Sequence, residues 1–266
     1  MEGKQKRLFF GLEALAPWPE NYPQGRLLKP KDRHLTLAFL GNTDFPKLEK
    51  ALSSFPSPPF TLGFTGIFDQ CLFLPSRDPR VVAWNILWNE KSDLLEGYYH
   101  DLIEWLKSHG FSPVTKHGFT PHATLCRAPF NKRVWEKSFS PLPFSTGSLH
   151  LYESLGHSTY QKIWSYSLSP PFEEIEHTAD LAFLVRGKDF STLLAHAETA
   201  LAFLFPPLIQ FREGRKPTSL DEVIITLNEQ ISHADKEIGT PIKAVSFSSQ
   251  LEEKDAIFTW EMILDV

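Results

Sequence analysis

Cysteine and long apolar runs are both scarce in this chain. Two cysteines, Cys71 and Cys126, stand among 266 residues, which gives neither a disulfide framework nor the spacing of a cysteine metal site. No apolar stretch approaches the roughly 20 residues that a membrane-spanning helix needs, so we expect no contact with a membrane. Glu13 interrupts the first apolar run and no small-residue cleavage site follows, so we interpret this run as a strand rather than a signal peptide. These features fit a protein of the reducing cytoplasm.

Charge is distributed unevenly along the chain. Residues 1–170 carry 19 Lys and Arg against 15 Asp and Glu, whereas residues 171–266 carry 8 against 17. The net charges of +4 and −9 together give the −5 of the whole chain. A mildly basic first part suits a phosphate-bearing substrate, and an acidic second part suits a cation or a basic partner.

One tetrapeptide pattern, His, apolar, Thr, Leu, occurs twice. It is His34-Leu35-Thr36-Leu37 in the first copy and His122-Ala123-Thr124-Leu125 in the second. Both copies lie in stretches typical of strands, where residues i and i+2 share a face. If the strands are close, two imidazoles and two hydroxyls line one trough. Two histidines can act as general base and general acid near neutral pH, and hydroxyls can donate to an anionic oxygen.

A single His-x-Thr on a strand is most often a surface or packing pair, but two copies make coincidence much less common. With these motifs, residues 7–168 resemble the 2H phosphoesterases, in the branch of LigT-like RNA 2′,3′-cyclic phosphodiesterases. The matching stretches include RLFFGLE, KPKDRHLTLAFLG, FLPSRDPRVVAWNILW, GFTPHATLCR and LHLYESL.

The resemblance implies a role for five residues. His34 and His122 would be catalytic, one deprotonating water and the other protonating the leaving ribose oxygen, with the second-motif histidine as base. The residues alone leave these two roles open. Thr36, Thr124 and Arg127 would hold the phosphate. Arg33 is a weaker candidate for contacting RNA.

The chain in order predicts α+β structure. We expect strands at 8–12, 34–41, 60–68, 80–88, 122–125, 149–152 and 163–168. Helical spacing predicts one helix capped by Thr43 or Asp44 and a second capped by Asp93, the second ending near Gly110. The Ser169-Pro170-Pro171 stretch is the best linker, which separates a domain at 1–169 from one at 172–266.

The second part has a different character. A strand, a turn at Gly187 and a helix from Phe190 are expected, and this part resembles archease, the activator of the RtcB-type RNA ligase, most specifically in its EHTAD string. The resemblance implies a metal site for calcium or magnesium formed by Asp180, Asp265 and the carboxylate of Val266. It also implies an RtcB-type ligase as partner. Because residues 206–222 are short and polar, we expect a shortened domain that lacks the second long helix.

The fold expected is therefore a duplicated, two-lobed 2H phosphoesterase fold followed by a smaller α+β archease-like domain. The function expected is hydrolysis, without a metal in the reaction, of RNA 2′,3′-cyclic phosphate ends to 2′-phosphates, in RNA repair or tRNA processing. A binding module that holds RNA ends for a ligase without turnover is the alternative. Ligation of 2′-5′ bonds would be the same chemistry in reverse.

Overall fold

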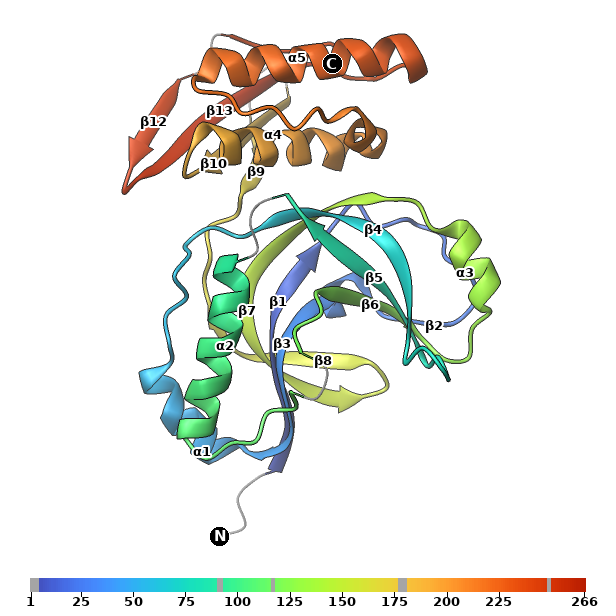
Figure 1. Cartoon of the computed structure of the whole chain (residues 1–266), viewed down its shortest axis with the longest axis vertical. Helices are drawn as coiled ribbons and strands as arrows, with labels where there is room; N and C mark the ends of the chain where they lie inside the picture. The colour runs from blue at the N-terminus through green and yellow to red at the C-terminus, as the bar shows by residue number, and fades with distance from the viewer. Residues whose placement is uncertain (1–4, 90–92, 116–117, 177–180, 248–249) are drawn as a thin grey trace.

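The computed structural model describes residues 5–89, 93–115, 118–176, 181–247 and 250–266. It contains two antiparallel sheets, each with its own buried apolar cluster. Figure 1 shows them one above the other, with the N-terminal unit below. The expected α+β class is confirmed at this coarse level. Among the described residues, no helix is long and apolar enough to cross a membrane.

The first unit is organised by a circuit of strands. The strand order is β1-β3-β6-β5-β4-β7-β8, and β1 also pairs with β7, so six strands close on themselves. The short strand β2 (Arg26–Leu27) pairs with β6. The other strands are β1 (Gln5–Leu15), β3 (His34–Asp44), β4 (Thr65–Leu74), β5 (Val81–Trp88), β6 (His122–Arg127), β7 (Leu142–Gly156) and β8 (Thr159–Tyr166).

In the described part of the first unit, three α-helices accompany this sheet: α1 (Phe45–Ala51), α2 (Asp93–Ser108) and α3 (Lys132–Ser138). The Asp44 side chain accepts a hydrogen bond from the Lys47 N–H and so caps α1 as the sequence predicts. Helix α2 buries one apolar stripe, and Gly110 with φ +74° follows its end. Helices α1 and α2 both lie against β3, the strand that carries the first His-x-Thr motif.

The expected strand at 60–68 is wrong in its bounds. The strand β4 begins at Thr65 and runs to Leu74, while Phe60 and Phe64 reach the core from a non-strand segment. Two prolines precede Phe60, and a Cβ at Gly63 would lie 2.4 Å from the Thr146 carbonyl oxygen. The Phe64 N–H donates to the Thr146 hydroxyl rather than to a strand carbonyl, so this part of the hydrophobic run belongs to the core without being a strand.

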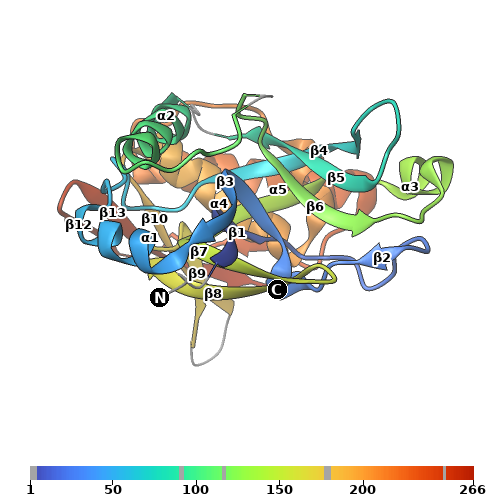
Figure 2. The ribbon, with the colours of Figure 1, turned by 90° about the horizontal axis from the view of Figure 1, so that it is seen from below.

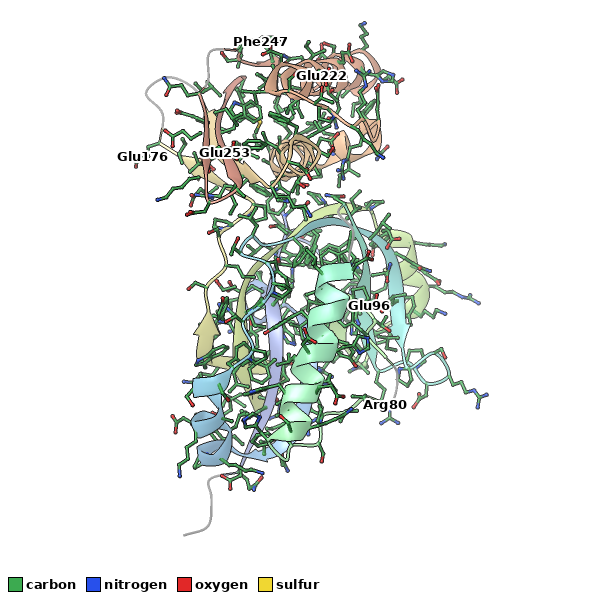
Figure 3. The ribbon with its side chains drawn as sticks, turned by 60° about the vertical axis from the view of Figure 1, so that its left-hand side comes forward. Arg80, Glu96, Glu176, Glu222, Phe247 and Glu253 are labelled. Carbon is green, nitrogen blue, oxygen red and sulfur yellow. The ribbon has the colours of Figure 1, made fainter. Side chains whose placement is uncertain are left out.

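The described residues of the second unit form five strands and two long helices. Alternate residues of β13, Trp260, Met262 and Leu264, are buried against the helices. The strands are β9 (Phe172–Ile175), β10 (Leu181–Gly187), β11 (Ala244–Val245), β12 (Leu251–Lys254) and β13 (Ile257–Asp265), and the helices are α4 (Phe190–Leu204) and α5 (Leu220–Ile238). Figure 3 places Glu222 and Phe247 at the end of this unit that points away from the first.

Helix α5 contradicts the expectation that a second long helix is missing. It has 19 residues and clear boundaries. The Ser219 side chain accepts from the Glu222 N–H, and the Glu222 carboxylate accepts from the Thr218 N–H. Gly239 ends the helix with φ +71°. These are ordinary helix-start and helix-stop signals, and the start signals lie inside the stretch 206–222 that suggested a gap.

The two units are in contact through buried polar groups. The Asn89 Nδ2 donates to Thr65 Oγ1 in the first unit and to Thr199 Oγ1 on α4, at 3.0 and 3.1 Å. The Arg212 guanidinium donates to Asn89 Oδ1 and pairs with Glu198 at 2.6 Å. A sequence reading does not reveal this junction, because its members lie far apart in the chain.

Candidate active site

The two His-x-Thr motifs lie on neighbouring antiparallel strands. Leu35 of β3 stands opposite Ala123 of β6, and both side chains are fully buried. Figure 2 shows these strands side by side, with β2 beyond β6. Because side chains alternate along a strand, the histidines and threonines point to the other face. The antiparallel register sets each histidine across from the threonine of the other motif, as the trough hypothesis requires.

Both imidazoles are held in the same way. The Nδ1 atoms of His34 and His122 each lie 2.8 Å from the carbonyl oxygen two residues earlier, that of Asp32 and that of Thr120. A carbonyl can only accept, so Nδ1 carries the proton in both rings. Each neutral ring therefore keeps its lone pair on Nε2, and each charged ring presents Nε2–H as a donor. The pair is built alike for taking or giving a proton.

Aromatic rings enclose His34. The centroids of Phe9, Tyr160 and Tyr152 lie 4.5, 4.9 and 5.2 Å from its ring, and His34 is 8% exposed. This burial lowers the pKa of His34 to about 4, with smaller lowering effects from His122 and the Arg127 guanidinium, while the Asp32 carbonyl works in the opposite direction. Burial also lowers the pKa of His122. Both rings are therefore neutral at pH 7 in the free protein.

A cavity of about 280 Å³ opens at the motifs. Its described lining residues are Arg7, Phe9, Arg26, His34, Thr36, Phe39, Thr124, Arg127, Ser154, Gly156, His157, Ser158 and Tyr160. Four of the five predicted catalytic and phosphate-binding residues are in this set. The fifth, His122, acts on the pKa of His34 but does not line the cavity. Three arginines and, among the described lining residues, no carboxylate make the cavity suited to an anion.

Three features of the site were missed by the sequence reading. The Arg127 Nη2 donates to Tyr160 Oη at 3.2 Å, which orients the guanidinium toward the cavity. The Asp32 carboxylate accepts from the Tyr160 N–H at 3.1 Å and is 3% exposed. Asp32 thus fixes β8 with its side chain and the His34 tautomer with its carbonyl. The polar pair Asp32-Arg33 directly before His34 was the one available sign that this segment supports the site. Nothing in the sequence predicts that Asp32 contacts Tyr160.

The third missed feature is the turn between β7 and β8. His157 and Ser158 have φ of +50° and +62°, and both line the cavity. Both central residues of a type I′ hairpin adopt this left-handed conformation, and Asp255 and Ala256 do the same between β12 and β13 of the second unit. Gly156 pairs with Thr159 across the turn, so the two residues are the whole loop of a tight hairpin. The loop forms part of the cavity wall.

Arg33 is corrected by the structure. Its side chain is not available to RNA, because the residue is 3% exposed and its Nε and Nη2 donate to the Leu28 carbonyl. Its guanidinium also lies 4.4 Å from the Trp18 ring. Arg33 holds the loop before β3 in place and contributes to the position of His34 only indirectly.

The predicted metal ligands are described in part. Asp180 lies outside the described residues. The Asp265 carboxylate is 3.8 Å from Lys243 Nζ, which also donates to the Val266 carbonyl at 2.8 Å. Among the described residues no group of three or more His, Cys, Asp or Glu could hold a metal. An ion here would have to displace the lysine, and the metal site stays a prediction.

No family model and no curated protein matches the sequence. Among solved structures, the chain is similar to E. coli LigT in complex with 3′-AMP, at 25% identity and TM-score 0.47, over 62% of this chain and 99% of that one. It is also similar to a phosphoesterase at 24% identity and TM-score 0.45, over 62% and 99%. A protein of Thermus thermophilus matches at 19% identity and TM-score 0.41, over 62% and 98%. These likenesses are too distant to carry a function to this chain, which has to come from the geometry of the site.

Proposed function

We propose that the protein hydrolyses the 2′,3′-cyclic phosphate ends of RNA to 2′-phosphates, with His34 and His122 as its acid–base pair. The observation that carries this proposal is the matched tautomer of the two rings. Both hold Nδ1–H on a backbone carbonyl, and they stand on adjacent strands, where His34 lines the arginine-containing cavity and His122 is near enough to lower the pKa of His34. A phosphodiester needs one proton removed from water and one delivered to the leaving oxygen, and two such imidazoles provide both.

The remaining groups fit the charge of the reaction. Thr36 and Thr124 hydroxyls can donate to the non-bridging oxygens, and Arg127 can neutralise the charge that gathers on a five-coordinate phosphorus. Both histidines are neutral in the free protein, so the anionic substrate must raise the pKa of the one that donates. The proton transfers and the charge neutralisation are then supplied by side chains, and the proposed step uses no metal ion.

The assignment of base and acid can be tested with a substrate that needs no acid. In a nucleoside phosphate ester of p-nitrophenol, the p-nitrophenolate group leaves without being protonated. His→Ala at the acid position should therefore recover most of its lost rate on this ester, whereas His→Ala at the base position should not. Equal losses for both variants on both substrates would reject an acid–base division of labour.

The alternative is a module that binds RNA ends without turnover. Its support is that the threonines and arginines of the cavity can bind a phosphate whether or not hydrolysis follows. Incubation of an oligonucleotide ending in a cyclic phosphate with excess EDTA separates the two. A 2′-phosphate product supports hydrolysis, and a bound but unchanged end supports the module.

We also propose that the second unit docks to an RtcB-type RNA ligase through a cation held near the end of β13. Leu181, the residue after Asp180, pairs with Leu264, the residue before Asp265, which supports testing the two carboxylates together. The two units would then have opposite effects on one pool of broken RNA. The second unit would promote joining by the ligase, whereas the first would produce 2′-phosphate ends that the ligase should not join. Protein with His34→Ala and His122→Ala should stimulate sealing by the ligase, and Asp180→Ala in that background should abolish it. Absence of binding and of stimulation would reject the docking.

A further inference from the structure

A second and larger cavity adjoins the active-site cavity. It is a groove of about 990 Å³ between the segment that precedes β2 and the start of α3. Arg26 lines both the groove and the active-site cavity, and it pairs with Arg127 across β2 and β6. Figure 2 shows β2 and α3 at the same end of the first unit. The groove therefore continues the proposed phosphate site rather than forming an isolated hollow.

The chemistry of the groove suits a nucleotide. Its nine described lining residues include the cations Arg26 and Lys132 and no carboxylate. Phe130 forms part of its apolar wall and is half-buried. Lys132 is 3.9 Å from Glu136, with both side chains more than half exposed, and exposed pairs of this kind are weak. Its ammonium also lies 5.0 Å from the centroid of the Phe73 ring, a contact that is weak at an exposed site. Lys132 can therefore exchange these partners for a phosphate, while Phe130 offers a ring to a base.

The wall of the groove is held close to β6 by a glycine. A Cβ at Gly25 would lie 2.3 Å from Cys126 Sγ, well inside contact distance. A side chain at residue 25 would require the Cys126 thiol or the segment itself to move. The close packing makes the wall a fixed surface next to the phosphate site.

We propose that this groove binds the nucleotide on the 5′ side of the terminal, cyclic-phosphate nucleotide. This inference rests on the proposed function and names its substrate as an oligonucleotide rather than a mononucleotide. An RNA strand leaves its terminal nucleotide through the 5′ oxygen, so the chain must run out of the active-site cavity. The groove provides a continuous, positively charged path, in which Lys132 neutralises the next phosphate and Phe130 packs against the next base.

The test compares substrates of one, two and four nucleotides, all ending in a 2′,3′-cyclic phosphate. Wild-type protein should show kcat/KM at least about tenfold higher for the dinucleotide than for the mononucleotide, on the scale of one stacked base. Lys132→Ala and Phe130→Leu should lose most of this gain and change the mononucleotide value less than about twofold, because neither residue lines the active-site cavity. Lys137→Ala, an exposed lysine of the same helix that does not line the groove, is the matched control and should behave as wild type.

A binding measurement keeps this inference separate from the proposed activity. Fluorescence anisotropy with a labelled tetranucleotide ending in a 2′-phosphate reports affinity without turnover. Lys132→Ala should reduce the slope of log K against log salt by about 0.7, the value for one lost contact to a single strand. Equal kcat/KM for one and two nucleotides, or equal losses by Lys132→Ala and Lys137→Ala in both assays, would overturn the groove. If no substrate is turned over but Lys132→Ala still weakens binding of the tetranucleotide, the proposed function is wrong and the groove is still supported as a nucleotide-binding site.

Discussion

At the scale of single residues, the account depends on two imidazoles with the same tautomer. His34→Ala and His122→Ala should each lower turnover of a cyclic-phosphate substrate by about 10²–10⁴, because each removes a general acid or base. The measurement is steady-state kinetics, with circular dichroism to confirm folding. His100→Ala, an exposed histidine on α2, is the control and should leave turnover unchanged. Near-wild-type turnover in either folded active-site variant would remove that histidine from the mechanism.

The lowered pKa values determine the pH dependence. A general base works only when deprotonated and a general acid only when protonated, so kcat/KM should follow a bell-shaped pH profile. The pKa of His34 is about 4 and that of His122 is also below its usual 6.5, so the maximum should lie below pH 6.5 and kcat/KM should rise as the pH is lowered from neutral. A maximum above pH 6.5, or a flat profile between about pH 5 and 9, would contradict the roles of the two buried rings.

At the scale of elements, Asp32 connects the loop before β3 to β8. Asp32→Ala leaves the Tyr160 N–H without its acceptor and frees Tyr160, the partner of Arg127. We expect kcat/KM to fall by about tenfold, the scale of one lost hydrogen bond. Asp32→Asn retains an oxygen acceptor and should recover most of the loss. If the two variants are equally impaired, the carboxylate does not act through this hydrogen bond.

The elements also show what a sequence can predict and what it cannot. The motif strands, the cap at Asp44 and the helix from Phe190 follow from local patterns, and the structure contains them. The prediction of a strand at 60–68 was wrong in its bounds, because an apolar run indicates burial but does not show that its backbone pairs with a neighbouring strand. Helix α5 could have been predicted from Ser219, Glu222 and Gly239. It was not expected, because the chain looked too short for the second long helix of the family that it resembles.

The contacts that complete the site could not be read from the sequence, because they join distant residues. Tyr160 meets Asp32 across 128 positions. The groove is formed by segments 23–26 and 129–134, which only the pairing of β2 with β6 brings together. The motif residues predicted from their repetition are near one another, whereas their supporting residues carry no repeated pattern.

At the scale of the whole molecule, an ion pair of the second unit, Glu198 with Arg212, lies at the junction, where Arg212 also donates to Asn89 of the first unit. Burial raises the pKa of Glu198, and the Arg212 guanidinium opposes this. Removing one partner of such a pair costs about 3–5 kcal/mol, so Arg212→Ala should lower the free energy of unfolding by that scale at pH 7. The deficit should shrink as the pH falls and Glu198 takes up a proton, since the penalty belongs to the charged form.

Chemical denaturation at several pH values measures this. Adding Glu198→Gln to Arg212→Ala should restore part of the stability, because a neutral amide leaves no unpaired buried charge. Arg215→Ala, which removes an exposed arginine paired with Glu213 and Glu229, is the matched control and should leave the free energy of unfolding close to that of the wild type. A pH-independent deficit in Arg212→Ala would show that the ion pair does not stabilise the junction.

The central claim is that His34 and His122 hydrolyse a cyclic phosphate, and product analysis tests it most directly. An oligonucleotide ending in a 2′,3′-cyclic phosphate is incubated with the protein in excess EDTA, and its end is identified by mass and by resistance to a 3′-phosphatase. The account predicts a 2′-phosphate from the wild type and an unchanged cyclic end from His34→Ala with His122→Ala. A cyclic end that the wild type leaves intact, or opens only when a divalent ion is restored, would contradict it.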